Sequence, residues 1–396
     1  MADLIKEWNL DHEISGIYLD NASTTYPKPH SVYDFMARFY RDRGVSPDRG
    51  LSEIAADAGR MAEETRKLLM RLFNIRGKPE RMVLTGSATQ GANIFLQGFL
   101  KKGDHAIATM LDHNAVLRPL NHLARDREVE TDFVPFDEKG YVQPEEIEYR
   151  IRPNTKLVVV NHGSNVLGTL QPLAEIGSIC RKHGVLFMAD VSQSAGAVSF
   201  DAGELDILFF PGHKSLYGPT GTGGLYVREG VEVVPLMQGG TGILSENPYH
   251  LDHYPHRLET GTPNILGIAG LYAGVRYIEE QGVEAIHEHE MTLYRRLVDG
   301  LQAIPCLTLY CAGREGKHLP VVSFNIECMH SSDVGNALAS YGISSRPGLH
   351  CAPKVHERMG TSKTGTVRLS IGAFNTQDHV DATIDAIREI AKDASG

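Results

Sequence analysis

Three short segments of the sequence carry side chains that can act together on one anionic ligand. The segment Leu84–Asn93, which reads LTGSATQGAN, follows an apolar run and opens a helical pattern. Small residues at a helix start let backbone N–H groups approach a phosphate. A second interpretation is a turn whose Ser or Thr caps the helix. The segment is neither a Walker loop nor G-x-G-x-x-G, so a nucleoside triphosphate or a dinucleotide is disfavoured.

The other two segments each place a charged residue at the end of an apolar run. Asp190 ends VLFMAD, and Lys214 ends FFPGHK just before a glycine-rich stretch. Strand ends of this kind form the ligand edge of a parallel sheet. A lone Asp more commonly caps a loop, and a lone Lys is usually solvated, but burial lowers the pKa of a lysine toward that of a reactive amine. A phosphate cup, a carboxylate and such an amine are what pyridoxal phosphate requires, so we predict this cofactor.

Alternating hydrophobic patterns indicate the elements that position these residues. Short β-branched and apolar runs alternate with helical patterns between about residues 80 and 228, which predicts an α/β fold with a doubly wound, mostly parallel sheet. Two amphipathic helices precede it. The expected strands are 81–85, 105–109, 156–161, 185–191 and 206–210, and the expected helices include 90–100 and 173–183.

After about residue 265 the pattern changes, which predicts a second unit. Long helices over 266–303 precede strands at 321–326 and 366–371, with helices at 332–341 and 377–392. We therefore predict a large domain over 16–265 and a smaller α+β domain over 266–396, on which residues 1–15 could pack.

Composition limits the class of protein. Hydrophobic residues are 42% and charged residues 22%, as in an ordinary globular protein. The net charge of −10 argues against binding nucleic acid or an anionic membrane surface. The N-terminus lacks a signal-like apolar region, and no apolar run approaches a membrane span. Five cysteines without CxxC pairing are typical of the reducing cytoplasm and predict neither a disulfide framework nor a metal site.

A series of motifs along nearly the whole chain resembles the class V aminotransferase-like family of pyridoxal-phosphate enzymes, and within it the cysteine desulfurases and selenocysteine lyases. These motifs are YLDNASTT (18–25), TGSAT (85–89), DHN (112–114), SNVLGT (164–169), ADVSQSAG (189–196), GHK (212–214), ETGTPN (259–264), RPGLHCAP (346–353) and GTVRLS (365–370). The resemblance implies fold type I of the pyridoxal-phosphate-dependent transferases.

The resemblance also implies roles for single residues. Lys214 would bind the cofactor covalently, Asp190 would pair with its pyridine nitrogen and Gln193 would reach its ring hydroxyl. Ala88, Thr89 and His213 would hold the phosphate, His113 would stack on the ring and relay protons, and Asn165 would lie near ring and substrate. Arg368 would clamp the substrate carboxylate, and Arg346 would also bind the substrate. Thr262 matches a residue that reaches the phosphate of the neighbouring subunit, which implies a homodimer with shared active sites; alternatively, it caps a turn.

Cys351 distinguishes among the reactions that this cofactor supports. It occupies the position of the cysteine that accepts sulfur in sulfur-removing relatives, with Arg346 and His350 nearby to favour the thiolate. A small buried hydrophobic role is the alternative. We therefore expect a cysteine desulfurase that forms L-alanine and a persulfide on Cys351. Selenocysteine lyase, another class V reaction (aminotransferase, racemase or β-lyase) with an incidental Cys351, and a non-catalytic scaffold remain alternatives.

Two further features bear on that expectation. The short stretch between Cys351 and Arg368 resembles the short-loop, group II branch, which favours a dedicated sulfur-acceptor protein. Pro211 stands where many relatives have a phosphate-binding serine, and proline supplies neither hydroxyl nor N–H. Ser215, just after the lysine, is a candidate to compensate for that loss.

Overall fold

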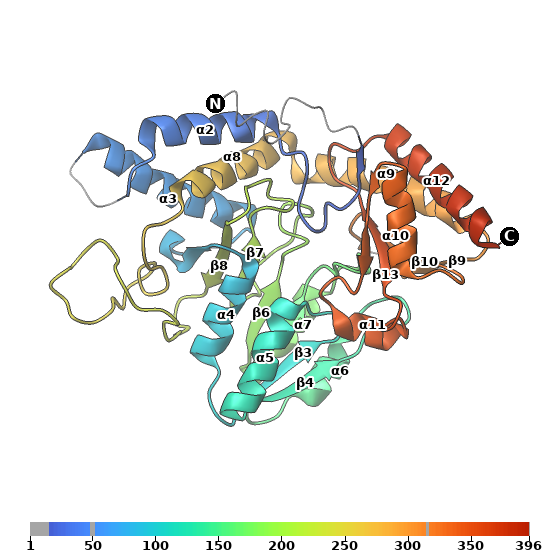
Figure 1. Ribbon diagram of the computed structural model, residues 1–396. Helices are drawn as coiled ribbons and strands as arrows, with labels where there is room; N and C mark the ends of the chain where they lie inside the picture. Colours follow the sequence, from blue (N-terminus) through green and yellow to red (C-terminus); the bar gives the residue numbers. More distant parts are fainter. Residues whose placement is uncertain (1–15, 48–51, 314–316, 396) are drawn as a thin grey trace.

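A seven-stranded sheet forms the centre of the computed structural model, which describes residues 16–47, 52–313 and 317–395 (Figure 1). The spatial order is β2-β8-β7-β6-β5-β3-β4, and β8 alone runs antiparallel to its neighbours. The predicted mostly parallel α/β sheet is therefore confirmed. Its strands are β2 (Met82–Thr85), β3 (His105–Thr109), β4 (Glu130–Val134), β5 (Thr155–Asn161), β6 (Leu186–Asp190), β7 (Ile207–Pro211) and β8 (Gly223–Val227).

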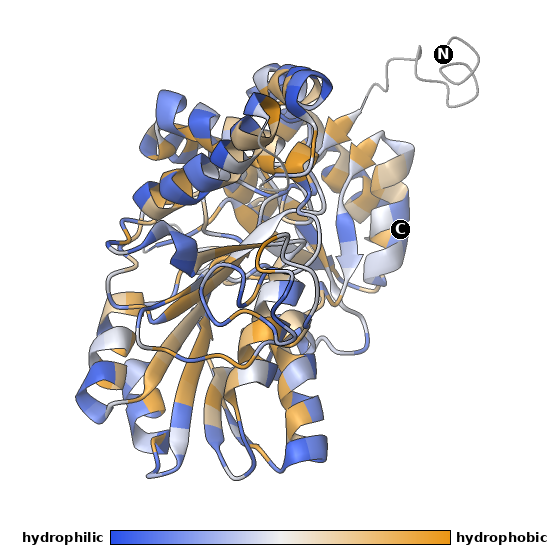
Figure 2. Cartoon of the chain, turned by 90° about the vertical axis from the view of Figure 1, so that its left-hand side faces the viewer, coloured by the Kyte–Doolittle hydropathy of each residue, from blue (hydrophilic) through white to orange (hydrophobic). Residues whose placement is uncertain are grey.

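Helices cover both faces of this sheet because its strands are apolar on both sides. Along β6, Phe187 packs into one hydrophobic cluster and Met188 into another, as the two-residue period of a strand requires. One cluster includes residues of α2 (His30–Arg43), α3 (Glu53–Leu72), α7 (Leu173–His183) and α8 (Ile265–Gln281). The opposite cluster includes residues of α4 (Ala88–Phe99) and α5 (Asn114–Arg127). The short α6 (Pro144–Arg150) lies against α7. Figure 2 shows the apolar strands between helices whose outer faces are polar.

A second, antiparallel sheet of order β12-β13-β10-β9 lies beside the first. It consists of β9 (Leu307–Tyr310), β10 (Val321–Ile326), β12 (Arg346–Gly348) and β13 (Thr366–Ser370). Near it in Figure 1 lie α9 (Val283–Gln302), α10 (Ser331–Ser340), α11 (Pro353–Met359) and α12 (Gln377–Ser395). The N-terminal β1 (Ile17–Tyr18) pairs in parallel with β11 (Ile343–Ser344), so both ends of the chain build this part of the molecule.

The predicted division of the chain at residue 265 stays a prediction. Residues of α8 share the core of the large sheet, whereas residues of α9 belong mainly to the core of the second sheet. We therefore propose a boundary at Gly282, between these two helices. The predicted packing of residues 1–15 lies outside the described residues. Within the described ranges, no helix combines the length and apolarity that a membrane crossing requires.

Candidate active site

A cavity of about 210 Å³ lies where the carboxyl ends of three parallel strands face the second sheet. Asn161, Asp190 and Pro211 close the ends of β5, β6 and β7, and arginines of β12 and β13 stand opposite. Ligand sites of open α/β sheets are found at this edge. The sequence-predicted residues that line the cavity are Ala88, Thr89, His113, Asn165, Asp190, Gln193, His213, Lys214, Arg346, Cys351 and Arg368.

The N-terminus of α4 forms an anion-binding cup at one end of the cavity. The Ser87 hydroxyl accepts a hydrogen bond from the Gln90 amide at 3.1 Å, so the capping interpretation is correct as well. The amide groups of Ala88 and Thr89 precede the first intrahelical donor and donate to no acceptor in the described part of the chain. Their N–H groups and the helix dipole therefore favour a phosphate here.

Asp190 and Lys214 meet at the floor of the cavity from adjacent strand ends. Asp190 is 2% exposed and accepts a hydrogen bond from the Ser192 amide at 2.9 Å. Burial raises the pKa of Asp190, while the nearby Lys214 acts to lower it. Burial lowers the pKa of Lys214 to about 8, and its ammonium forms no hydrogen bond or ion pair with the described residues. At pH 7 roughly a tenth of Lys214 is therefore the neutral amine, far more than for a lysine with the ordinary pKa of about 10.4.

His113 and Asn165 are held in place by the backbone around them. His113 precedes α5, and its Nδ1 accepts a hydrogen bond from the Ala115 amide at 3.0 Å. Burial, with Lys214 nearby, lowers the pKa of His113 to about 4, so the ring is neutral and carries its proton on Nε2. Asn165 donates to the His350 carbonyl at 2.7 Å, and its own carbonyl accepts from Arg368 at 3.0 Å.

Arg346 and Arg368 face each other because β12 and β13 pair them directly in register. Arg368 is 1% exposed and donates to Asp20 Oδ1 at 2.6 Å. Arg346 Nη2 lies 3.8 Å from Cys351 Sγ. The Cys351 backbone adopts the left-handed conformation (φ 57°), and its carbonyl accepts from the Asn114 amide at 2.8 Å, which ties the cysteine to the start of α5.

The expected contribution of His350 to the Cys351 thiolate stays a prediction, and the buried surroundings of the His350 ring disfavour a positive charge on it. His350 is 3% exposed, and burial, with Arg368 nearby, holds its pKa well below its usual range. Its Nε2 contacts the Thr366 hydroxyl at 2.9 Å, so it orders the loop as a neutral ring. Arg346 is thus the charged group nearest to the sulfur.

Two other residues from the sequence analysis, Thr262 and Ser215, do not line this cavity. Thr262 is exposed and lines a wide cavity that also touches Gly86 and Gln90 on the outer side of the cup. Ser215 lines a separate, small cavity that Pro211 does not line, so compensation for the missing hydroxyl stays a prediction. Gln193 donates to the Ala22 carbonyl at 2.9 Å.

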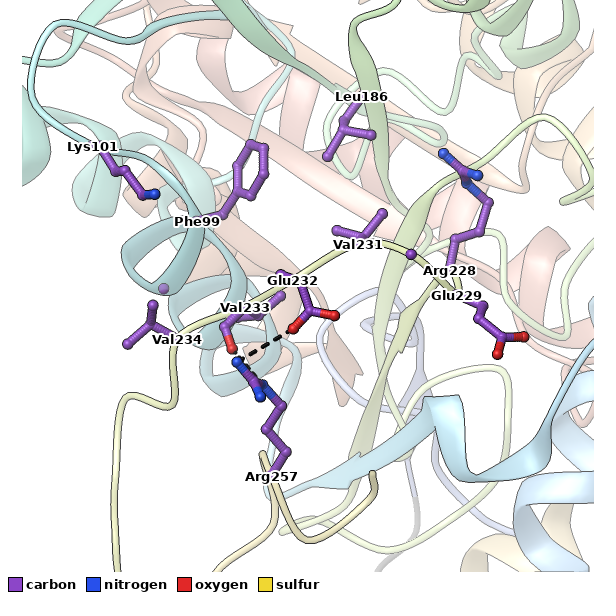
Figure 3. Close-up of a pocket in the computed structure, with 12 residues that line it drawn as sticks. Phe99, Lys101, Leu186, Arg228, Glu229, Val231, Glu232, Val233, Val234 and Arg257 are labelled. Carbon is purple, nitrogen blue, oxygen red and sulfur yellow. Dashed lines mark hydrogen bonds and ion pairs between the residues drawn. The ribbon is translucent and has the colours of Figure 1, made fainter. Parts of the chain in front are cut away.

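A second cavity, of about 390 Å³, lies near the amino ends of the parallel strands, opposite to the ends that face the first cavity (Figure 3). Leu186, which lines it, begins β6, whereas Asp190 ends that strand at the first cavity. Its Arg257 is already held by the Val233 carbonyl at 2.8 Å and by Glu232 at 3.4 Å. Within the described residues, no side chain that lines this cavity has a buried polar atom without a partner, unlike the lining of the first cavity.

The residues of the first cavity fit pyridoxal phosphate. The cup offers unpaired N–H groups to a phosphate, the Asp190 carboxylate suits a protonated ring nitrogen, and the free Lys214 amine suits an aldehyde. Three buried atoms of residues that line the cavity, Asn165 Oδ1, His350 Nδ1 and Arg368 Nε, have no partner in the described chain. Buried polar atoms are normally satisfied, so these three indicate that a polar ligand completes the site.

Sequence reasoning assigned no role to Asp20 or Ser23, although both lie in the quoted YLDNASTT motif. The Ser23 hydroxyl contacts Asp20, Arg346 and Arg368. The sequence signal for these contacts was an acidic residue and a hydroxyl residue in the segment before the first long helix. Because this segment lies far from Arg346 and Arg368 along the chain, the sequence did not reveal the contact.

Comparison with known proteins gives one answer. The model of the family described as Aminotransferase class-V matches residues 17–383. A probable cysteine desulfurase of Pyrococcus abyssi is 34% identical over 98% of this chain and 97% of its own length. The apo structure of a cysteine desulfurase from Thermococcus onnurineus NA1 is 34% identical, with a TM-score of 0.88 over 96% of this chain and 95% of that one. The cysteine desulfurase CsdA of Escherichia coli is 27% identical, with a TM-score of 0.84 over the same shares.

These likenesses extend over both sheets, and the predicted fold type I of the pyridoxal-phosphate-dependent transferases is confirmed. With a family model that spans most of its length and full-length relatives above 30% identity, the chain belongs to the class V aminotransferase family.

Proposed function

We propose that this protein is a pyridoxal-phosphate-dependent cysteine desulfurase that converts L-cysteine to L-alanine and carries the released sulfur as a persulfide on Cys351. The observation that carries the proposal is the arrangement of one cavity, in which a free amine (Lys214), a buried carboxylate (Asp190) and a thiol (Cys351) face a pair of arginines. Full-length relatives named cysteine desulfurase support the same reaction.

Each group has a chemical task that follows from its environment. The N–H groups of Ala88 and Thr89 would hold the phosphate, and Asp190 would keep the pyridine nitrogen protonated. When bound, the cofactor supplies an electron-withdrawing ring that stabilises negative charge at the substrate α-carbon. Lys214, with its pKa lowered to about 8 by burial, would bond the aldehyde at rest and afterwards move the α-proton on Nζ.

The substrate would be oriented by the two arginines. Arg368 can still donate from its free, buried Nε, and would bind the α-carboxylate. The thiolate of Cys351 would attack the substrate sulfur, so that an S–S bond forms as the Cβ–S bond breaks. The three-carbon skeleton would take up protons and leave as alanine. The neutral His113, with its proton on Nε2, is a donor beside these steps.

The assay compares variants of two cysteines. Purified protein with L-cysteine or L-selenocysteine is followed for sulfide or selenide, alanine and pyruvate. We expect Cys351→Ser to abolish alanine formation and the protein persulfide, while Cys328→Ser, at an exposed cysteine, keeps both. Equal alanine formation in Cys351→Ser would refute the persulfide step. Pyruvate in place of alanine would identify a β-lyase.

The cofactor assignment has its own test. Wild type reconstituted with pyridoxal phosphate should absorb in the visible range and lose the band in Lys214→Ala, because the amine that bonds the aldehyde is gone. A matched control is Lys28→Ala, which removes a lysine that contacts the His213 carbonyl at 3.0 Å without lining the cavity. A band that survives Lys214→Ala and disappears in Lys28→Ala would contradict the assignment.

A homodimer with shared active sites forms part of the proposal. The exposed Thr262 lies beside a cavity of about 730 Å³ at the outer side of the cup. Exposed apolar side chains follow in the nearby loop, namely Val234, Leu236, Met237, Leu244 and Tyr249. Light scattering should give twice the chain mass, and a monomeric holoenzyme would reject the dimer.

The setting of the reaction is also proposed. None of the five cysteines forms a disulfide in the structure, which fits a reducing cytoplasm. The turn between β12 and α11 is short, and the Cys351 carbonyl is anchored to α5, so the thiol has little reach of its own. We therefore propose that a dedicated acceptor protein comes to the site to collect the sulfur.

A further inference from the structure

The hydroxyl of Ser23 stands between the two arginines of the candidate active site. Its Oγ lies 2.5 Å from Arg346 Nη1, 2.9 Å from Arg368 Nη2 and 2.8 Å from Asp20 Oδ1. Ser23 lines the cavity, whereas Asp20 lies behind it, outside the cavity lining. One hydroxyl therefore contacts three charged groups at the wall where the substrate carboxylate would bind.

The hydrogen-bonding capacity of this hydroxyl is fully used. A guanidinium only donates, so Ser23 Oγ accepts from both arginines with its two lone pairs. Its single hydrogen is left for the carboxylate of Asp20. This assignment leaves no freedom of rotation, because any other direction of the O–H bond would break a charge-assisted bond.

The two arginines depend on Ser23 to different degrees. Arg368 has other acceptors, since it also donates to Asp20 and to the Asn165 carbonyl. In the described part of the chain, the Arg346 side chain contacts only two acceptors, Ser23 Oγ and Cys351 Sγ. The sulfur contact is 3.8 Å long, so the short bond to Ser23 is what fixes the Arg346 guanidinium.

We propose that Ser23 is a positioning residue that holds the Arg346 guanidinium against Cys351 Sγ and links it to the carboxylate-binding Arg368. The two arginines and Asp20 together carry one net positive charge, which matches the single α-carboxylate of a neutral amino acid. Ser23 thereby joins the group that binds the substrate to the group that stabilises an anionic sulfur. This inference rests on the proposed function for the roles of Arg368 and Cys351.

The first test uses the cofactor-free protein, so it does not depend on the reaction. Iodoacetamide alkylation of each cysteine is followed by peptide mass spectrometry at neutral pH, with exposed Cys328 as the internal reference. Because the thiolate is the reactive form, Ser23→Ala should slow alkylation of Cys351 about fivefold relative to Cys328, the order of one lost hydrogen bond. Ser23→Thr restores the hydroxyl and should recover most of the rate.

The control variant is Ser340→Ala, which removes an exposed hydroxyl whose bond is local to α10. It should leave the ratio of the two alkylation rates unchanged. An unchanged ratio in Ser23→Ala, with an unfolding temperature that shows a folded protein, would overturn the proposal. An equal slowing in Ser23→Thr would also overturn it, because a hydroxyl at that position would then not matter.

A second readout uses the holoenzyme. Ser23→Ala should raise KM for L-cysteine about tenfold and lower kcat as well, since both the carboxylate clamp and the thiol are affected. If alkylation responds as expected but no variant converts cysteine, the proposed function fails and the positioning role stands. If wild type converts cysteine and Ser23→Ala matches it in KM, kcat and alkylation, the positioning role fails alone.

Discussion

Of the five N–H donors of Arg368, three bond Asn165, Asp20 and Ser23, so two remain for a substrate, and this allows a quantitative prediction for Arg368→Met. Its guanidinium is 1% exposed, and its buried Nε has no acceptor among the described residues. A hydrogen bond to a charged group is worth about 1.5–3 kcal/mol, so a two-bond clamp contributes about 4 kcal/mol. Since 1.4 kcal/mol is a factor of ten, kcat/KM for L-cysteine should fall roughly a thousandfold.

The assay compares L-cysteine with L-cysteinamide, which has no carboxylate. Wild type should prefer L-cysteine by about the same thousandfold, and Arg368→Met should lose that preference because clamp and carboxylate act as one pair. Arg368→Lys keeps the charge but not the planar guanidinium, so its kcat/KM for L-cysteine should lie between those of wild type and Arg368→Met, roughly thirtyfold below wild type. Unfolding temperatures establish that each variant is folded. If Arg368→Met lowers kcat/KM by the same factor for L-cysteine and L-cysteinamide, Arg368 does not contact the carboxylate.

Three further predictions concern other parts of the molecule. Pro211→Ser adds a hydroxyl to the wall of the active-site cavity, so the Kd for pyridoxal phosphate in a fluorescence titration should fall about tenfold. An unchanged Kd would contradict the placement of the phosphate beside Pro211. Burial raises the pKa of Glu290 to about 8 from 4.5, so the folded state keeps a proton that the unfolded state loses, and stability falls as pH rises between these values. Glu290→Gln should therefore raise the unfolding temperature at pH 8 and leave it unchanged at pH 4.5, whereas equal shifts at both would reject the reasoning. Arg66 donates to Glu259 at 2.6 and 2.8 Å, so Arg66→Met leaves this carboxylate without its cation and should lower the free energy of unfolding in denaturant by about 3 kcal/mol. The double variant Arg66→Met with Glu259→Gln should recover part of that loss, and no recovery would argue against the ion pair.

The sequence predicted best those elements whose pattern is set by local burial. β3 and α7 have the predicted bounds 105–109 and 173–183, because an apolar run between polar ends leaves one choice. β8 was read as part of a glycine-rich loop, yet Gly223 and Gly224 are strand residues. A Cβ at Gly224 would lie 2.3 Å from the Phe210 ring, so close strand packing, rather than a turn, requires that glycine.

The sequence pattern named no bounds for helix α5. This helix contains Pro119 and several charged residues, and its N-cap is His113, a residue type outside the usual capping set. In the candidate site, the sequence pointed to Lys214, Asp190 and Cys351 because few residue types can do their chemistry. It did not predict which hydrogen-bond partners hold the site residues. That Asn165 holds the cysteine turn, and that His350 is neutral, depends on contacts between segments far apart in the sequence.

The pairing of β1 with β11 has a consequence for how the molecule is made. Residues 17–18 pair with 343–344, and Ser23 and Asp20 contact arginines that lie 323 and 348 residues further along the chain. Closing so long a loop has an entropic cost, and contacts this distant in sequence form slowly. The large sheet needs no residue beyond 227 for its strands, so it can assemble first. The cavity is therefore completed last, and a nascent chain is protected from binding substrate until its C-terminal strands are in place.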